Sequence, residues 1–373
     1  MHIVFISHEY PLWSPGGVGS FLQTFGRALV KEGHQVTVVG AGMDAKEVIL
    51  EDKGVQLIRL PKKTGWKPAF WHNANVLNRK LRVLQEQHGI DIIESAELGL
   101  ALLSKKHPAK KVIRLHGGHH FFAEAENRGI DKKKGWLERR SFAKADGFIA
   151  VSQYVKDHTA KYLSYHKKPI AIIPHPMDTD ISIPQVTVQK DRILFAGTIC
   201  EKKGVRQLLQ AFYLLRKEFP EKELDLFGRD WYYPNGDSYI ERIQQEIPAS
   251  HFDNVTFHGS IPKEDLMVRY AEAAFCVFPS HMETQGLVTL EAMLMEKPVI
   301  FTKYGPGPET ITHKENGLLC DVYQPEAIAA QMLWCIHHPE KATQLGKAAR
   351  KHIQTHFDKN RILEQNIAFY QSL

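Results

Sequence analysis

Short apolar runs alternate along the chain with longer segments in which apolar residues recur every three or four positions. The first kind predicts buried β-strands and the second amphipathic helices. In the first half we expect strands at residues 2–7, 36–40, 55–60, 90–94, 111–115, 147–151 and 170–173. Helices are expected at residues 19–32, 73–88, 99–105, 134–145 and 153–163. This alternation predicts a parallel sheet with helices on both faces.

A second series of the same kind follows a proline-rich stretch, residues 174–184, that has no clean period and is typical of a linker. Strands are expected at residues 192–196, 224–227, 255–258, 275–279, 299–302 and 317–320. Helices are expected at residues 205–218, 237–246, 263–273, 287–295, 325–337 and, in the tail, 352–372. The pattern predicts two Rossmann-like, doubly wound α/β domains, residues 1–180 and 185–354, that face each other across a cleft.

Composition narrows the class of protein. The chain has 373 residues, more than one hydrophobic core usually contains, so two domains are expected. Its content of 43% hydrophobic and 24% charged residues is ordinary for a globular protein. No apolar run is long enough to span a membrane, and residues 1–7 are an apolar strand without the basic start of a signal peptide. The four cysteines form no CxxC pair, which argues against a zinc site or a disulfide framework. We therefore expect a cytoplasmic protein.

The net charge of +6 arises from an excess of cations in the first half of the chain. It is open whether these cations form a solvated surface or a face that meets an anionic membrane or a phosphorylated acceptor. They lie on no nucleic-acid-binding motif, so no nucleic-acid partner is expected. The two clusters are Lys132–Lys134 with Trp136, Arg139 and Arg140, and Lys62, Lys63 and Lys67 with Trp66, Phe70 and Trp71.

Two junctions between a strand and a helix carry glycines that could admit a phosphate. The loop 7–19 contains Gly16 and Gly17, but its spacing is not GxGxxG, so on spacing alone a tight turn without a ligand is favoured over a phosphate site. The second junction, residues 195–204, places Thr198 and Lys203 near Gly204. Lys203 could reach a phosphate or be solvated.

A third junction carries two carboxylates around a glycine. The N–H groups of Gly286, Leu287 and Val288 would open a helix and could hold a diphosphate. Glu283 before the helix and Glu291 within it could accept hydrogen bonds from sugar hydroxyls. That combination suits a nucleotide sugar. The alternative is that Glu291 complements the helix dipole and Glu283 is a solvated loop acid.

Over nearly its whole length the sequence resembles a family 4 glycosyltransferase of the GT-B fold. Its Glu-x7-Glu element matches Glu283 to Glu291. Other matching segments are Glu32–Val38, Arg114–Gly117, residues 145–152, Lys297–Ile300, Pro308–Ile311 and Asn316–Gly317, together with the first glycine loop. The order and spacing of these segments carry the resemblance.

The resemblance implies roles for particular residues. It assigns catalysis to His116, beside the reacting sugar, and to Glu283, on the donor-sugar hydroxyls. It implies transfer with retention of configuration and without a metal or other cofactor. It also implies that a tail helix, residues 355–373, packs on the N-terminal domain. Donor binding is assigned to Gly16, Gly17, Thr198, Lys203, Gln285, Gly286, Leu287, Val288 and Glu291.

One position departs from the family. Members often carry an arginine directly after the glycine of the second junction, whereas Gly197 is followed here by Thr198. Lys202 or Arg206 could replace that cation. Two metal-like patterns are discounted: Asp178-Thr-Asp180, which lies in the linker, and His116 with His119 and His120, which lack a suitably spaced further ligand.

These observations predict an enzyme that moves a sugar from a nucleotide-diphosphate sugar to an acceptor hydroxyl, in surface polysaccharide or glycolipid synthesis. The N-terminal domain would bind a saccharide or lipid-linked acceptor, with peripheral contact to an anionic membrane. UDP is favoured only because it is the commonest donor nucleotide in the resembling family. A nucleotide-sugar epimerase, a phosphorylase-like enzyme and a catalytically weak nucleotide-sugar-binding protein remain alternatives.

Overall fold

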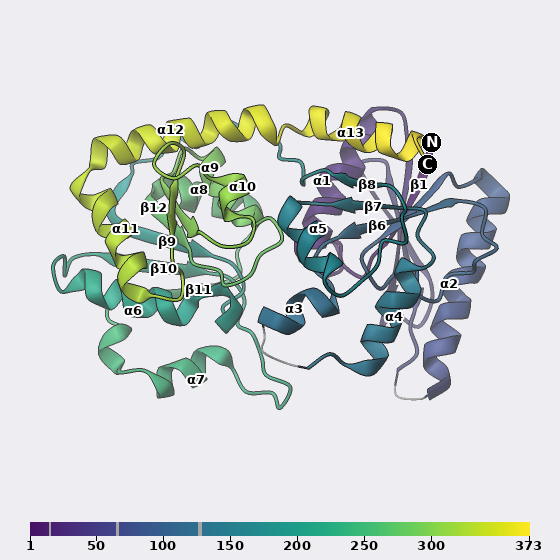
Figure 1. The fold of residues 1–373 in the computed structure, drawn as a ribbon, viewed down its shortest axis with the longest axis horizontal. Coiled ribbons are helices and arrows are strands. Elements are labelled where there is room, and N and C mark those ends of the chain that lie inside the picture. The colour runs from purple at the N-terminus through teal and green to yellow at the C-terminus, as the bar shows by residue number, and fades with distance from the viewer. Residues whose placement is uncertain (15, 65–66, 126–128) are drawn as a thin grey trace. The chain divides into compact units, whose positions relative to one another are not determined.

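The computed structural model describes residues 1–14, 16–64, 67–125 and 129–373 (Figure 1). The chain forms two compact α/β units. Unit 1 consists of Met1–Asp178 with Lys359–Leu373, and unit 2 of Thr179–Asp358. Trp66, which belongs to one of the predicted basic and aromatic clusters, lies outside the described residues.

Unit 1 is built on an eight-stranded sheet in the order β3-β4-β2-β1-β5-β6-β7-β8. Neighbouring strands are parallel except for β3, which pairs antiparallel with β4. The strands β1, β6 and β7 are buried on both faces, apart from Lys110 at the start of β6, and most of their side chains are apolar. The strands are β1 (His2–Ile6), β2 (Gln35–Gly42), β3 (Val48–Asp52), β4 (Val55–Pro61), β5 (Ile92–Ser95), β6 (Lys110–Leu115), β7 (Gly147–Ala150) and β8 (Ile170–Ile172).

The helices of unit 1 include the last helix of the chain. They are α1 (Gly17–Lys31), α2 (Lys67–His88), α3 (His119–Ala125), α4 (Lys132–Phe142), α5 (Gln153–Ala160) and α13 (Lys359–Gln371). A buried polar network ties α13 to the sheet. The Arg114 guanidinium donates to Glu94 at 2.7 Å and to Asn366 Oδ1 at 2.5 Å, and the Tyr370 hydroxyl donates to Glu94 at 2.6 Å.

The predicted helix at residues 99–105 is wrong, because this segment forms successive turns. Side chains from α2, from α4 and from the residues after α4 bind several of its carbonyl groups. Arg140 and Lys144 donate to the Ala101 carbonyl at 2.8 and 2.7 Å, and Asn78 donates to the Leu102 carbonyl at 2.9 Å. Tertiary contacts therefore override the local helical pattern.

Unit 2 contains a six-stranded, fully parallel sheet in the order β11-β10-β9-β12-β13-β14. Its strands are β9 (Gln189–Ala196), β10 (Glu223–Phe227), β11 (Val255–Gly259), β12 (Ala273–Phe278), β13 (Val299–Thr302) and β14 (Leu318–Cys320). Its helices are α6 (Val205–Arg216), α7 (Tyr239–Glu246), α8 (Lys263–Glu272), α9 (Leu287–Leu294), α10 (Gly307–Thr310), α11 (Pro325–His337) and α12 (Pro339–His356), with the 3-10 turns η1 (Glu201–Lys203) and η2 (Ala249–His251).

The predicted single tail helix, residues 352–372, is two helices. The first, α12, already begins at Pro339, and α13 begins at Lys359. Phe357 and Asp358 separate them. The unit boundary falls at this break, so α12 belongs to unit 2 and α13 to unit 1.

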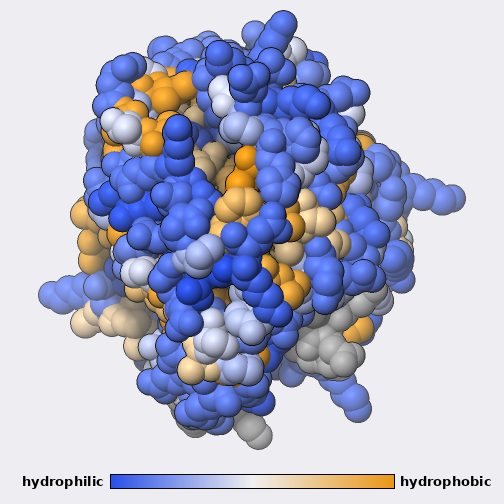
Figure 2. Space-filling model, turned by 90° about the vertical axis from the view of Figure 1, so that its left-hand side faces the viewer, coloured by the Kyte–Doolittle hydropathy of each residue, from blue (hydrophilic) through white to orange (hydrophobic). Residues whose placement is uncertain are grey.

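The face of the molecule drawn in Figure 2 is mostly hydrophilic. Figure 2, which looks onto the left-hand side of Figure 1, shows its hydrophobic residues in separate small groups. Among the described residues no helix is long and apolar enough to cross a membrane.

Candidate functional site

In unit 2 the loops that leave the carboxyl ends of four strands are held against one another. Gly197 donates to the Phe227 carbonyl at 2.9 Å, and Gly228 donates to the Gly259 carbonyl at 2.8 Å. The loops after β9, β10 and β11 are thereby joined. Gly204 lies so close to the end of β12 that a Cβ there would sit 1.9 Å from the Pro279 carbonyl oxygen. This edge of a parallel sheet is where ligands bind in open α/β folds.

Lys203 and Glu283 meet at this edge. Lys203 is the last residue of η1, and its ammonium donates to Glu283 Oε1. The hydroxyl of Ser280 donates to the same carboxylate oxygen at 3.0 Å. The two charged side chains are only 20% and 10% exposed, so a cation and an anion stand together in a partly desolvated place. The buried side chain of Gln285 follows in the same turn.

The start of α9 offers free backbone donors. Gly286 has φ of +81°, a conformation that favours glycine, and it is the N-cap of the helix. Within the described ranges, the N–H groups of Gly286, Leu287 and Val288 have no hydrogen-bond partner. Three aligned donors at the positive end of a helix dipole are suited to an anion.

Glu291 lies one turn into α9, with its side chain 11% exposed. Its carboxylate oxygen Oε1 is 3.0 Å from the ammonium of Lys263, whose side chain is 53% exposed. Its charge also adds to the effect of burial in raising the pKa of Tyr270 well above its usual value. Glu291 is therefore paired with an exposed cation that a ligand could displace.

Arg206, one of the two cations that could compensate for Thr198, is already paired with carboxylates. Thr198 is half-buried after Gly197. Arg206 donates to Glu201 at 3.1 Å and to Glu246 at 2.6 Å, so its guanidinium is committed elsewhere. Arg229, in contrast to Arg206, lies next to Thr198. Its carbonyl accepts from the N–H of Ile199, the residue after Thr198, at 2.9 Å.

The Arg229 side chain is exposed, and its guanidinium has no ion-pair or hydrogen-bond partner in the part of the chain that the structure describes. Sequence analysis missed this residue. The available signal was a basic side chain directly after Gly228, at the carboxyl end of β10. The other residue named as a replacement, Lys202, uses its carbonyl to accept from the His281 N–H at 2.9 Å.

In unit 1, His116 follows β6 and stacks on His175, with ring centroids 5.1 Å apart. Phe21 packs against both rings. Burial, followed by the nearby Arg114 charge, lowers the pKa of His116 to about 3. The imidazole is therefore neutral at physiological pH and can donate one hydrogen bond and accept another.

Two buried carboxyl groups hold the backbone that follows His116. Glu97 accepts from Gly117 N–H at 2.8 Å, and Glu138 accepts from the N–H groups of His119 and His120. Burial and, to a lesser degree, the charge of Glu138 raise the pKa of Glu97 to about 8. Sequence analysis missed both acids, because nothing local links a residue after β5 to one inside the basic helix α4.

Gly16 and Gly17, also in unit 1, open α1, but an internal carboxylate occupies this helix start. Glu9 Oε2 accepts from the N–H groups of Val18 and Gly19 at 3.1 and 3.3 Å. A Cβ at Gly16 would lie 2.2 Å from the same oxygen. An anionic ligand at α1 would therefore compete with Glu9. Residue 15 of this loop lies outside the described residues.

Residues of the two metal-like sequence patterns, Asp178, His119 and His120, are bound to other groups of the protein. Asp178 pairs with Lys359 at 2.6 Å, and His119 Nε2 accepts from Asp131 N–H at 2.8 Å. His120 Nδ1 hydrogen-bonds Glu138. Among the described residues, no three His, Cys, Asp or Glu side chains are grouped so that they could hold a metal ion.

Two family models match the chain and together span almost all of it. The model described as "Glycosyltransferase Family 4" matches residues 15–181, and that described as "Glycosyl transferases group 1" matches residues 177–352. A glycogen synthase of Mycobacterium tuberculosis is 23% identical over 96% of this chain and 91% of its own length.

Solved structures show the same fold. The sucrose-phosphate synthase of Thermosynechococcus elongatus superposes with a TM-score of 0.85 at 23% identity, over 100% of this chain and 98% of that one. Anabaena HepE in complex with UDP-glucose gives 0.78 at 18% identity, over 100% of both chains. With matching models for both halves and this likeness over the full length, the chain belongs to glycosyltransferase family 4 and has the GT-B fold.

Proposed function

We propose that this glycosyltransferase transfers a sugar from a nucleoside-diphosphate sugar, with UDP as the favoured nucleotide, to a hydroxyl of its acceptor. The proposal rests on the start of α9. Three N–H groups without a partner in the described part of the chain lie there between Glu283, which is paired with Lys203, and Glu291. HepE was solved with UDP-glucose, which supports a uridine nucleotide.

Each part of the donor has a group of suitable chemistry. The diphosphate would accept hydrogen bonds from Gly286, Leu287 and Val288 and would be neutralised by Lys203 and Arg229. The hydroxyl of Thr198 would add a neutral hydrogen bond. Glu291 would accept from the ribose hydroxyls, and Glu283 and Gln285 from those of the transferred sugar.

Residues of unit 1 would complete the reaction. Gly16 and Gly17 would lie by the donor phosphates once Glu9 releases the N–H groups of Val18 and Gly19. The neutral imidazole of His116 would donate a hydrogen bond to a hydroxyl of the reacting sugar.

The proposed reaction retains the anomeric configuration and uses no metal. The bond from the anomeric carbon to the diphosphate breaks, and the acceptor oxygen bonds to that carbon on the same face. The proton of the acceptor hydroxyl passes to the leaving phosphate oxygen. Lys203, Arg229 and the α9 dipole would stabilise the charge that develops on the leaving group. Trapping of a covalent glycosyl-enzyme would overturn this route.

Unit 1 would bind the acceptor, a saccharide or lipid-linked molecule of surface polysaccharide or glycolipid synthesis, at the cytoplasmic face of a membrane. The exposed residues Lys132–Lys134 on α4 support a peripheral contact with anionic lipid. Sedimentation with phosphatidylglycerol vesicles tests this contact. Replacing the three lysines with glutamine should abolish binding, and unchanged binding would remove the membrane from the proposal.

The donor is tested by a thermal-shift screen against UDP-, GDP- and ADP-sugars and the free diphosphates, with and without EDTA. A ligand of the folded state raises the Tm by mass action. We expect a selective shift by uridine nucleotides that is indifferent to EDTA and is lost in Glu291→Ala. A shift by another base would replace UDP, and no shift with any nucleotide would overturn the donor site. Consumption of donor without an acceptor would indicate an epimerase instead.

A further inference from the structure

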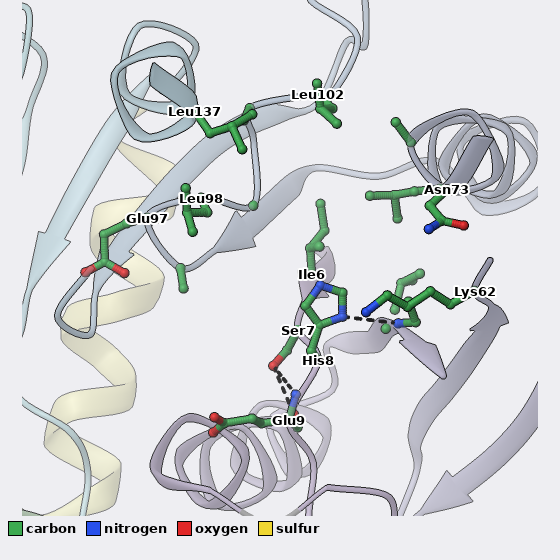
Figure 3. Close-up of a pocket in the computed structure, with 18 of the residues that line it drawn as sticks. Ile6, Ser7, His8, Glu9, Lys62, Asn73, Glu97, Leu98, Leu102 and Leu137 are labelled. Atoms are coloured by element: carbon green, nitrogen blue, oxygen red, sulfur yellow. Dashed lines mark hydrogen bonds between the residues drawn. The ribbon is translucent and has the colours of Figure 1, made fainter. Parts of the chain in front are cut away.

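A pocket of about 670 Å³ lies within unit 1 at the carboxyl edge of its sheet (Figure 3). Its lining comes from the ends of β1, β2, β4, β5 and β6, and from α2, α3 and α4. The volume lies within the usual range for small-molecule sites, and the carboxyl edge of a parallel sheet is where such sites occur. The pocket is therefore the place in unit 1 where an acceptor would bind.

The walls of the pocket are mainly aliphatic and aromatic. Figure 3 shows Leu98, Leu102, Leu137 and Ile6 among the lining side chains, and Phe70 and Leu77 of α2 also contribute. A sugar ring presents hydroxyl groups on nearly every carbon, and hydroxyls that lose water without gaining a partner are costly. Walls of this kind are suited to an apolar group.

Most polar side chains of the lining already have partners inside the protein. Ser7 Oγ donates to the Glu9 carbonyl at 2.9 Å, and the Asn73 amide both donates to and accepts from the Lys63 backbone. Glu97 accepts from Gly117 N–H. Few side chains are therefore left to bind the hydroxyls of a neutral sugar.

Two cations of the lining are the exception. Lys62 and Lys134 are exposed at the pocket, and neither ammonium has a carboxylate or hydrogen-bond partner among the side chains that the structure describes. In Figure 3 the Lys62 side chain extends towards His8 and the open space. Lys133 precedes Lys134 in the chain, and its ammonium lies 4.7 Å from the ring centroid of Phe70, which also lines the pocket. The positive charge at the mouth is thus not neutralised from within.

From these observations we propose that the acceptor of this enzyme is an amphiphilic anion, in which an apolar aliphatic or aromatic group fills the pocket and an attached phosphate or carboxylate binds Lys62 and Lys134. This deepens the proposed function and rests on it. In the transfer, the acceptor's hydroxyl oxygen bonds to the anomeric carbon as the diphosphate leaves with the hydroxyl proton. The proposal excludes an unsubstituted neutral sugar and a sugar phosphate without an apolar group.

Isothermal titration with small probes tests the pocket in the full chain. Octyl phosphate, kept below its micellar concentration, represents the aliphatic source, and 2-naphthyl phosphate represents the aromatic one. We expect at least one of them to bind at least tenfold more tightly than inorganic phosphate, glucose 6-phosphate and 2-naphthol. The probe that binds more tightly shows whether the apolar group of the acceptor is aliphatic or aromatic. Equal affinity for glucose 6-phosphate, or binding of neither amphiphile, would overturn the proposal.

Matched variants locate the binding. Leu98, 39% exposed on the pocket wall, can be changed to glutamate without opening the core, and Leu12, 55% exposed and outside the lining, is its control. Leu98→Glu and Lys62→Glu should each weaken probe binding at least tenfold, and Leu12→Glu and Lys63→Glu less than twofold. Equal losses in the controls, or binding only to phosphatidylglycerol vesicles that Leu98→Glu leaves intact, would indicate a non-specific basic surface and overturn the pocket.

The nucleotide thermal shift of the wild-type protein separates the two proposals. If uridine nucleotides raise the Tm but neither probe binds, the proposal of an amphiphilic acceptor is wrong and the donor site stands. Probe binding without any nucleotide shift overturns the donor site, and with it the assignment of the bound amphiphile as an acceptor.

Discussion

Replacing Glu283 with glutamine should separate the two ends of the donor. The carboxylate forms an ion pair with Lys203, and we assign it to the hydroxyls of the transferred sugar. The amide has nearly the same shape and can still accept from the Ser280 hydroxyl, but it carries no charge. Free UDP, which lacks the sugar, would therefore gain a more available Lys203, whereas UDP-sugar would lose a charged acceptor.

The magnitude follows from the exposure of the pair. Both side chains are at most 20% exposed, so hydrogen bonds to them are charge-assisted and poorly screened by water. A hydrogen bond to a charged group contributes about 1.5–3 kcal/mol, which corresponds to a factor of about 10 to 150 in affinity. We expect Glu283→Gln to weaken UDP-sugar binding by about tenfold or more and to leave UDP binding unchanged or up to about fivefold tighter.

Isothermal titration of UDP and UDP-glucose measures both effects. A double-mutant cycle with Lys203→Ala isolates the coupling of the pair. The exposed Glu264 on α8 provides a matched control, since Glu264→Gln changes the same charge outside the site. Equal weakening of UDP and UDP-glucose by Glu283→Gln would refute the reasoning. Tighter UDP binding in Lys203→Ala would remove Lys203 from the diphosphate.

Three further predictions concern other residues. Arg229→Ala should raise the Kd for UDP at least fivefold in the same titration. Arg206→Ala should raise it less than twofold, because the Arg206 side chain is bound to Glu201 and Glu246. A larger effect of Arg206→Ala would show that Arg206, and not Arg229, binds the diphosphate. Because its folded pKa of about 8 lies above its usual 4.5, Glu97 stabilises the fold when protonated. That stability is lost as pH rises from about 4.5 through about 8, so the Tm of Glu97→Gln should fall less than that of the wild type between pH 6 and 9. Glu94→Ala leaves the buried Arg114 unpaired and should cost about 3–5 kcal/mol in urea unfolding, whereas joint replacement of both by leucine and methionine should restore most of it.

The alternating pattern predicted the parallel strands because most of them contain a buried apolar run, as β1, β7 and β13 do. It missed β3, an edge strand with an exposed centre that pairs with β4 across a tight turn. Lys53 and Gly54 make that turn, both with positive φ. A basic residue at such a position gives little signal in the sequence, so the hairpin could not be anticipated.

The site could be predicted where its parts are close in sequence. Glu283, Gly286 and Glu291 stand in one loop and the helix that it opens, and their spacing alone suggests a ligand with hydroxyls and phosphates. Partners distant in sequence were beyond reach. The pairing of Glu97 with Gly117 and the commitment of Arg206 to Glu246 depend on how strands and helices are brought together.

The helix starts of α1 and α9, both of which contain glycine, show how a contact absent from the local sequence pattern changes a predicted site. Sequence patterns made both α1 and α9 candidates for anion binding, but Glu9 accepts from N–H groups in the first turn of α1, whereas the first N–H groups of α9 have no partner among the described residues. A carboxylate nine or ten residues away in sequence thus decides whether a helix start is ready to accept an anion.

The pairing of Lys203 with Glu283 has a consequence for turnover. In the proposed donor complex, the sugar hydroxyls would occupy Glu283 and the diphosphate would occupy Lys203, so the ion pair would be exchanged for two ligand contacts. Once the sugar is transferred, Glu283 has no ligand and is again available to Lys203. The carboxylate then competes with the diphosphate for the same ammonium, which weakens the hold on the product and not on the substrate. Removing the charge at Glu283 should therefore slow release of the nucleoside diphosphate as well as weaken the donor.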